Sequence, residues 1–286
     1  MQAIEGAVPS QAQTGLKTTY LKQSLFLACQ CKPTGDMVVQ LPDSGGVDVP
    51  VRISGKRMLN HNVMLVDLSS ELLFTCEPGQ FITLINSEGT ARSYSVANNP
   101  TIEGHIELHV RLIANGMMSQ FLTKAEVGSA MIVRGPAGNC FYVGGDDQDY
   151  PIVLAGTGTG LAPLYGIVRE ALAKGHKGPI QLFHGALRDA DLYLVEELQA
   201  LEHMHKGFRY IPCVLGGEAG RFYQCGHIEE IVTASVTGDK SVFRLFLCGA
   251  PDFVKSLRKK AFLAGIRSSH IFADAFLPSA PLKTAA

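Results

Sequence analysis

A glycine-rich segment, Gly156-Thr157-Gly158-Thr159-Gly160, has the residue types that bind the phosphates of a dinucleotide. It follows the apolar run 152–155 and precedes Pro163, which suits the first turn of a helix. Glycines let the backbone approach a pyrophosphate, and a helix N-terminus stabilises its negative charge. Tight turns after strands often contain glycine for conformational reasons, and this spacing differs from Gly-x-Gly-x-x-Gly, so the segment alone leaves both interpretations open.

Two upstream segments have residue types that suit a flavin. The first, Arg92-Ser93-Tyr94-Ser95, offers a cation for a phosphate, an aromatic plane for a flat ring and a hydroxyl for a ring nitrogen. The second, Gly116-Met117-Met118-Ser119, begins a predicted short helix whose N-terminal amides suit a pyrophosphate. From residue types alone, an ordinary amphipathic strand explains the first segment better.

The elements that must position these segments predict two domains, as a length of 286 residues also favours. From Val49 to about Tyr142, two-residue alternation between Pro- and Gly-containing turns indicates an antiparallel β-barrel with one short helix at 117–125. After the acidic link 144–149, apolar runs alternate with helical segments. This alternation indicates a parallel sheet with crossover helices.

The second domain is predicted to be a five-stranded α/β domain. We expect strands at 152–155, 180–184, 208–214, 244–248 and 270–273, and helices near 161–174, 191–203, 226–236 and 251–264. The glycine segment then lies at the carboxyl end of the first strand, where parallel sheets bind ligands.

Composition argues against several classes of partner and site. A net charge of −1 gives no reason to expect nucleic acid or a membrane surface. No apolar run is long enough for a membrane-spanning helix, and the N-terminus does not resemble a secretory signal. We therefore expect a cytoplasmic location. Seven cysteines without a Cys-x-x-Cys pair predict neither a disulfide framework nor a metal site. The basic cluster 258–260 is either a solvated helix face or a docking patch for an acidic electron carrier.

Four motifs in one order resemble the ferredoxin–NADP reductase superfamily. They are Arg-x-Tyr-Ser at 92–95, Gly-x-x-Ser at 116–119, Gly-x-Gly-x-Gly-x-x-Pro at 156–163, and Cys248-Gly249-Ala250-Pro251. The resemblance covers residues 50 to 278 and is strongest to the NAD(P)H:FAD reductase components of bacterial multicomponent oxygenases. It implies an FAD-binding β-barrel at 46–145, an NAD(P)-binding α/β domain at 150–278 and a tail at 279–286.

The resemblance also implies roles for individual residues. Arg92 would contact the FAD pyrophosphate, Tyr94 the isoalloxazine and ribityl chain, and Ser95 flavin N5. The turn at 116–119 would hold the FAD pyrophosphate and the turn at 156–160 the nicotinamide-nucleotide phosphates. The catalytic candidates are Ser95, Cys248 and Phe276. Further cofactor contacts are expected from Ser93, His109, Val110, Arg188, Asp191, Gly249 and Pro251.

Residues 1–45 resemble the end of a plant-type [2Fe–2S] ferredoxin domain, with Cys29 as its last cluster ligand. The Cys-x4-Cys-x2-Cys run that supplies the other ligands of such a cluster is absent, so no [2Fe–2S] cluster is expected in this chain. Two explanations stay open. Either translation begins upstream of Met1, or the lineage has lost the cluster and uses a separate ferredoxin.

The implied function is transfer of a hydride from NADH or NADPH to FAD and of single electrons to an iron–sulfur acceptor, either a ferredoxin or an oxygenase component. Arg188 suits the 2′-phosphate of NADPH, whereas Asp189 and Asp191 suit the ribose hydroxyls of NADH. Charge therefore leaves the nucleotide open, and the resemblance favours NADH. The alternatives are a freestanding flavin or quinone reductase and a non-catalytic nucleotide-binding module.

Overall fold

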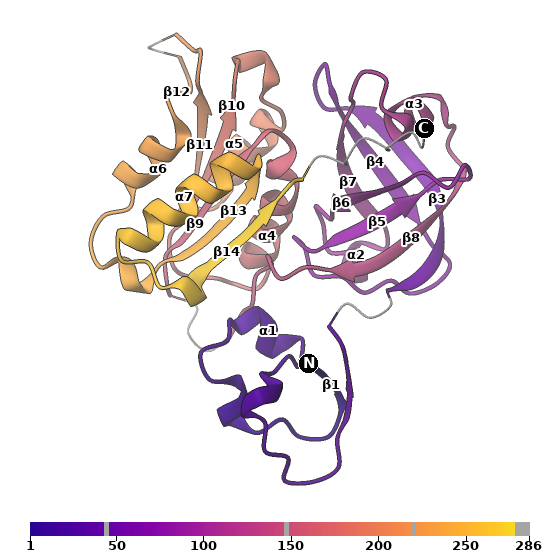
Figure 1. The fold of residues 1–286 in the computed structure, drawn as a ribbon. Helices are drawn as coiled ribbons and strands as arrows, with labels where there is room; N and C mark the ends of the chain where they lie inside the picture. Colours follow the sequence, from indigo (N-terminus) through magenta and orange to yellow (C-terminus); the bar gives the residue numbers. More distant parts are fainter. Residues whose placement is uncertain (43–45, 146–148, 219–220, 278–286) are drawn as a thin grey trace, which may run out of the picture.

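The computed structural model describes residues 1–42, 46–145, 149–218 and 221–277. An amino-terminal region, a β-barrel and an α/β domain follow one another along the chain (Figure 1). The predicted tail at 279–286 and residues 146–148 of the predicted acidic link lie outside the described residues.

The amino-terminal region is small and contacts both other parts. Strand β1 (Gln2–Glu5) pairs antiparallel with β2 (Val38–Gln40), and helix α1 (Thr18–Lys22) lies between them in the sequence. Lys22 forms an ion pair with Glu77 of the barrel, and the Lys17 ammonium donates a hydrogen bond to the Ile271 carbonyl of the α/β domain. Helix α1 therefore spans the two larger domains on one side (Figure 1).

Six antiparallel strands form the barrel, in the order β6-β5-β8-β3-β4-β7. The Val96–Leu108 bridge brings its two edge strands together. Alternate residues of the strands point inward and are buried, which confirms the predicted antiparallel barrel. The strands are β3 (Val47–Met58), β4 (Val63–Ser69), β5 (Phe81–Ile85), β6 (Ala91–Ser95), β7 (Ile106–Arg111) and β8 (Ala130–Ala137).

Two short helices accompany the barrel. Helix α3 (Met117–Lys124) is the predicted one. Helix α2 (Pro100–Glu103) was not predicted, because four residues are too few to show a helical period. It begins where the Asn99 side chain accepts a hydrogen bond from the Thr101 amide.

The α/β domain is a parallel sheet in the order β12-β11-β10-β9-β13-β14. Helices α4 and α5 pack on one face and α6 and α7 on the other, over two separate apolar clusters. The strands are β9 (Ile152–Thr157), β10 (Ile180–Ala186), β11 (Phe208–Val214), β12 (Gln224–Cys225), β13 (Arg244–Gly249) and β14 (Ile271–Ala275). The helices are α4 (Leu161–Ala173), α5 (Val195–Met204), α6 (Ile228–Ser235) and α7 (Pro251–Leu263).

Three sequence predictions in this domain need correction. The sheet has six strands rather than five. The prediction missed β12, because its two residues are exposed and form no apolar run. The helix expected from 191 begins at Val195, since 189–191 form a 3₁₀ turn and Leu194 has a φ of 55°. The last strand extends to Ala275 rather than ending at residue 273. The prediction ended it too early because Asp274 is charged and interrupts the apolar run.

The barrel and the α/β domain meet closely at two glycines. A Cβ at Gly166 of α4 would lie 2.8 Å from the carbonyl atoms of Ala97, and a Cβ at Gly79 would lie 2.9 Å from Cδ1 of Ile167 in α4. Hydrogen in place of a side chain lets the backbone at each glycine approach the other domain. Within the described residues, no helix combines the length and apolarity needed to cross a membrane.

Candidate functional site

The glycine turn and the Cys248 turn pack directly against each other, at the carboxyl ends of neighbouring strands β9 and β13. A Cβ at Gly160 would lie 2.2 Å from the Cys248 carbonyl oxygen, and one at Gly249 would lie 2.5 Å from Thr157 Oγ1. The Ala250 amide donates to the same Thr157 hydroxyl at 3.1 Å. These two predicted motifs therefore form one surface, and only glycine fits at its contact points.

Helix α4 begins directly after this surface. Gly160 is its N-cap residue and provides no side-chain hydrogen bond to the first turn. In this turn the Leu161 amide is hydrogen-bonded to carbonyls of the preceding 3₁₀ turn and Pro163 has no amide hydrogen, so α4 offers an anion mainly the positive end of its dipole. A nucleotide phosphate is the anion that this arrangement fits, with the glycine backbone close enough to contact it.

Arg111 lies beside the glycine turn, and the sequence interpretation missed it. A Cβ at Gly158 would lie 3.9 Å from the Arg111 guanidinium, which is exposed at the end of β7. A barrel cation therefore borders the predicted nucleotide site of the other domain. The only signal in the sequence was a charge that ends the alternating run 106–112, and this is an ordinary strand ending.

Ser95 joins the barrel to the α/β domain through its side chain. Its hydroxyl donates to Asp274 Oδ2 at 3.5 Å, and Ser95 itself is 7% exposed. Burial raises the pKa of the Asp274 carboxyl above its usual range, and the hydrogen bond from Ser95 offsets part of this increase. Asp274 is therefore a second functional candidate that the sequence interpretation missed.

Phe276 lies next to these groups through its backbone. Its amide donates to the Gly249 carbonyl at 2.9 Å, which fixes the chain end of β14 against the Cys248 turn. The candidate residues thus meet at the carboxyl end of the sheet. They are Ser95, Asp274, Phe276, the Cys248 turn and the glycine turn. The structure brings these sequence predictions together, and their roles remain predictions.

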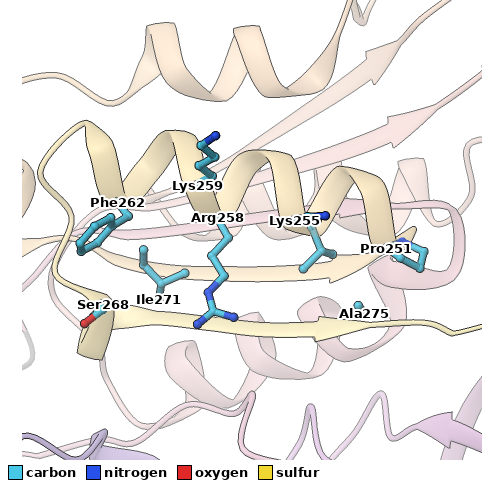
Figure 2. Close-up of a pocket in the computed structure, with 9 residues that line it drawn as sticks. Pro251, Lys255, Arg258, Lys259, Phe262, Ser268, Ile271 and Ala275 are labelled. Atoms are coloured by element: carbon cyan, nitrogen blue, oxygen red, sulfur yellow. The ribbon is translucent and has the colours of Figure 1, made fainter.

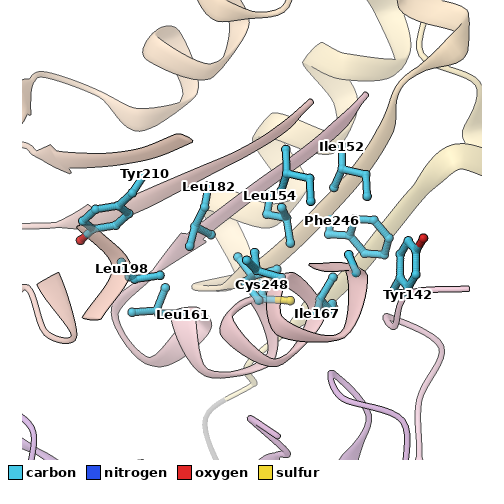
Figure 3. Close-up of a cluster of buried hydrophobic side chains, with 14 of the residues drawn as sticks. Tyr142, Ile152, Leu154, Leu161, Ile167, Leu182, Leu198, Tyr210, Phe246 and Cys248 are labelled. Atoms are coloured by element: carbon cyan, nitrogen blue, oxygen red, sulfur yellow. The ribbon is translucent and has the colours of Figure 1, made fainter. Parts of the chain in front are cut away.

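The Cys248 thiol points into the protein. Cys248 has no exposed surface, belongs to the apolar cluster beneath α4 (Figure 3) and has its sulfur 3.7 Å from that of Cys140. Burial, with the Cys140 contact second, raises the pKa of the Cys248 thiol well above its usual range. In this conformation Cys248 supports the turn from inside the protein and presents no thiolate at the surface.

On the barrel side, strand β6 presents the predicted flavin residues. Arg92 is half-buried and donates to its neighbouring Ala91 carbonyl at 2.7 Å, while Ser93 pairs with Thr83 at 3.3 Å. Tyr94 packs against the barrel core, and burial raises the pKa of its hydroxyl to about 12. The ring therefore stays neutral at ordinary pH and suits contact with a flat, apolar ring system.

The turn at 113–119 has the features of an anion site. Gly116 caps helix α3 without a side-chain hydrogen bond to its first turn, and the Ser119 hydroxyl instead accepts from the Ile113 amide at 2.9 Å. Met117 is 45% exposed, whereas Met118 is buried in the barrel core. The Ser119 hydroxyl thus holds the turn, and the helix amides have no side-chain cap at Gly116, as the prediction of a pyrophosphate site here requires.

Two further predicted contacts, His109 and Val110, are buried on β7. Both ring nitrogens of His109 have partners, the Tyr193 hydroxyl at 3.3 Å and Glu107 at 2.9 Å. Val110 points into the barrel core. The His109 side chain therefore supports the interface between the domains and the Val110 side chain supports the barrel core, and in this conformation neither residue is exposed to a cofactor.

Arg188 and Asp191 pair with each other after strand β10. Two guanidinium nitrogens of Arg188 lie 3.2 and 3.3 Å from the Asp191 carboxylate. The hydrogen bond from Arg188 lowers the pKa of Asp191, and His61 of the barrel lies 3.4 Å away. Arg188, which would favour NADPH, and Asp191, which would favour NADH, thus neutralise each other's charge.

Comparisons with known proteins match both domains. Residues 50–142 match the family described as the oxidoreductase FAD-binding domain, and residues 154–259 match the oxidoreductase NAD-binding domain. These ranges contain the site residues described above except Asp274 and Phe276, which follow residue 259. FAD and a nicotinamide nucleotide are therefore the cofactors of this chain.

Relatives match nearly the whole chain. The ferredoxin–NAD(P)(+) reductase component of the naphthalene 1,2-dioxygenase system of Pseudomonas putida is 30% identical over 284 residues, which are 97% of this chain and 85% of that protein. The reductase subunit of an aromatic O-demethylase from Amycolatopsis sp. is 33% identical over 243 residues, 81% and 72% of the two chains. The crystal structure of an Amycolatopsis cytochrome P450 reductase superimposes with a TM-score of 0.76 and 27% identity, covering 98% of this chain and 87% of the other.

Proposed function

Because this chain belongs to the ferredoxin–NADP reductase superfamily, we propose that it transfers a hydride from NAD(P)H to FAD and then single electrons to an iron–sulfur acceptor protein. It is an FAD-dependent NAD(P)H oxidoreductase with both cofactor domains. FAD supplies the conversion between a two-electron donor and one-electron acceptors. The task of the protein is to hold the two cofactors in a reactive orientation.

The contact between Ser95 and Asp274 carries this proposal. It places a hydroxyl of the predicted flavin strand against the α/β domain, next to the Cys248 turn and the glycine turn. Ser95 is proposed to orient the flavin through a hydrogen bond to its reactive ring nitrogen. Asp274, whose pKa burial raises, is proposed to hold a proton near the Ser95 hydroxyl at higher pH than an exposed carboxyl does.

The acceptor is proposed from the relatives. The Pseudomonas putida relative is the reductase component of a dioxygenase system, and the Amycolatopsis relative serves an aromatic O-demethylase. We propose that the acceptor of this chain is likewise a ferredoxin or an oxygenase component. A cytoplasmic location belongs to the same proposal, supported by seven cysteines that are all free.

NADH is the proposed donor. A 2′-phosphate needs an unpaired cation, whereas the Arg188 guanidinium is already paired with Asp191. The Asp191 carboxylate would also repel the negatively charged 2′-phosphate of NADPH. The ribose hydroxyls of NADH carry no charge and suit this neutral pair better.

An acceptor comparison tests the proposal. The FAD-loaded chain is given NADH or NADPH with menadione, an uncharged quinone, or with a plant-type [2Fe–2S] ferredoxin. We expect a higher kcat/KM with NADH and rapid ferredoxin reduction. Reduction of menadione without ferredoxin reduction would identify a quinone reductase instead, and no reduction of either acceptor would contradict the whole proposal.

A further inference from the structure

A groove lies between helix α7 and strand β14, and the predicted cofactor contact Pro251 lines one end of it (Figure 2). It has a volume of about 490 Å³. The α7 residues that line it recur every three or four positions, so they form one face of the helix. Strand β14 is an edge strand of the sheet and pairs only with β13 among the described strands.

Three cations border the groove without acidic partners. Lys255, Arg258 and Lys259 are exposed, and no carboxylate oxygen of the described residues lies within 4.0 Å of their side-chain nitrogens. Lys17 of the amino-terminal region lies near enough to Arg258 that repulsion between the two cations, after burial, lowers the pKa of Lys17. In a chain of net charge −1, this is a concentrated positive surface.

The floor of the groove is apolar. Val254 and Ile271 are 5% and 1% exposed, whereas Phe262 at one end of the groove is 57% exposed. An apolar centre with an aromatic residue and a charged rim is typical of protein interfaces. A small anion would use the cations and leave the apolar surface uncovered.

The position of the groove connects it to the site. Its lining includes Ala275, which lies between Asp274 and Phe276 in the sequence. Asp274 contacts Ser95 of the flavin strand, and the Phe276 amide bonds to Gly249. A protein bound in the groove would therefore stand beside the end of β14 that reaches the proposed flavin site.

We propose that the α7–β14 groove docks an acidic surface of the iron–sulfur acceptor. This inference rests on the proposed function and adds the place where the acceptor binds. Carboxylates of the acceptor pair with Lys255, Arg258 and Lys259, and an apolar side chain packs against Val254 and Phe262. Long-range attraction between the opposite charges raises the rate of association.

Charge reversal on two sides of α7 tests the docking site. The double variant Arg258→Glu/Lys259→Glu changes the groove, and the control Lys240→Glu/Lys260→Glu makes the same change in charge on the opposite side of α7. Each FAD-loaded protein is assayed with NADH and an acidic plant-type [2Fe–2S] ferredoxin at several salt concentrations. Menadione and the basic protein cytochrome c serve as reference acceptors.

We expect the groove variant to lose about tenfold or more in kcat/KM for ferredoxin at low salt, and less at high salt. The control variant should stay within about twofold of the wild type, and menadione reduction should be unchanged in both. The groove variant should not lose activity with cytochrome c, which carries the opposite charge. If the groove variant does not fold, Arg258→Gln/Lys259→Gln should give a smaller loss in the same direction.

Two results would overturn the docking site while leaving the proposed function intact. One is equal ferredoxin kinetics in the groove variant and the wild type. The other is charge-dependent binding of the groove to anionic phospholipid vesicles or duplex DNA, with ferredoxin reduction unchanged by the substitutions. A wild-type protein that reduces menadione but no ferredoxin would instead overturn the proposed acceptor, and docking with it.

Discussion

Ser95 and Asp274 form a contact between side chains 179 positions apart in the sequence. Ser95 could be predicted, because a hydroxyl next to Tyr94 on a strand forms part of a motif. Asp274 could not, because an acid at the end of a strand usually faces solvent, and only the folded chain shows it partly buried against Ser95. Arg111 was missed for the same reason, since its neighbour Gly158 belongs to the other domain.

Replacing Ser95 with alanine should slow the reduction of bound FAD by NADH on the order of 10²-fold, because a small loss of orientation at the reacting atoms is costly. The FAD content of the purified variant should match that of the wild type. Stopped-flow bleaching of the flavin absorbance measures the rate. Ser129→Ala, in a barrel turn where the hydroxyl accepts a hydrogen bond from the Glu126 amide, is the control. An unchanged rate in Ser95→Ala would exclude the proposed role.

At the scale of elements, the apolar runs predicted the strands that have buried neighbours on both sides. Strand β10 is an example, because it lies inside the sheet between β9 and β11. Strand β12 could not be predicted, since its two residues are exposed and are defined only by pairing with Cys213 and Val214. Periodicity reports burial, so an element without burial leaves no pattern.

Strand β10 also contains a buried histidine that makes folding sensitive to acid. His184 is unexposed, its Nδ1 lies 3.1 Å from the Tyr210 hydroxyl, and its Nε2 has no partner among the described residues. Burial lowers the pKa of His184 to about 3, below the value of about 6.5 for an unfolded chain. The contribution of neutral His184 to the free energy of unfolding is therefore fully present above about pH 6.5 and is lost as the pH falls from there toward 3.

Between pH 7 and pH 5, this group should cost about 2 kcal/mol of unfolding free energy, since the unfolded chain takes up a proton that folded His184 does not. The variant His184→Phe keeps a ring beside Tyr193 and should lose that much less over the same interval. Urea unfolding at both pH values measures the difference. His203→Gln, at an exposed position, should behave like the wild type. Equal pH dependence in His184→Phe and the wild type would show that His184 is protonated while buried.

For the whole molecule, the division into a barrel and an α/β domain followed from the change of period near residue 150. The way the domains fit together did not, because the fit depends on close contacts across the interface, such as those of Gly79 with Ile167 and of Gly166 with Ala97. The contact of Lys17 with the α/β domain and that of Lys22 with the barrel could not be predicted from the sequence either. Interfaces of this kind combine residues that share no local pattern.

Introducing alanine at Gly166 should separate the domains slightly, because its Cβ would lie 2.8 Å from Ala97 and 2.9 Å from Pro78. Alanine favours a helix, so α4 itself should remain intact. We expect FAD and NADH to bind with little change and flavin reduction to slow about tenfold or more. Gly35→Ala, where a Cβ meets no atom within 4 Å, is the control. Flavin reduction as fast as in the wild type would show that this contact does not set the orientation of the domains.

The most direct test of electron transfer is a single-turnover experiment without oxygen. NADH is mixed with the FAD-loaded chain in stopped flow, and oxidised [2Fe–2S] ferredoxin is added in a second mixing step. We predict that the flavin absorbance bleaches after the first step and recovers after the second, while the ferredoxin spectrum changes to that of the reduced protein. A chain that binds no FAD, or a flavin that NADH does not bleach, would contradict the central claim.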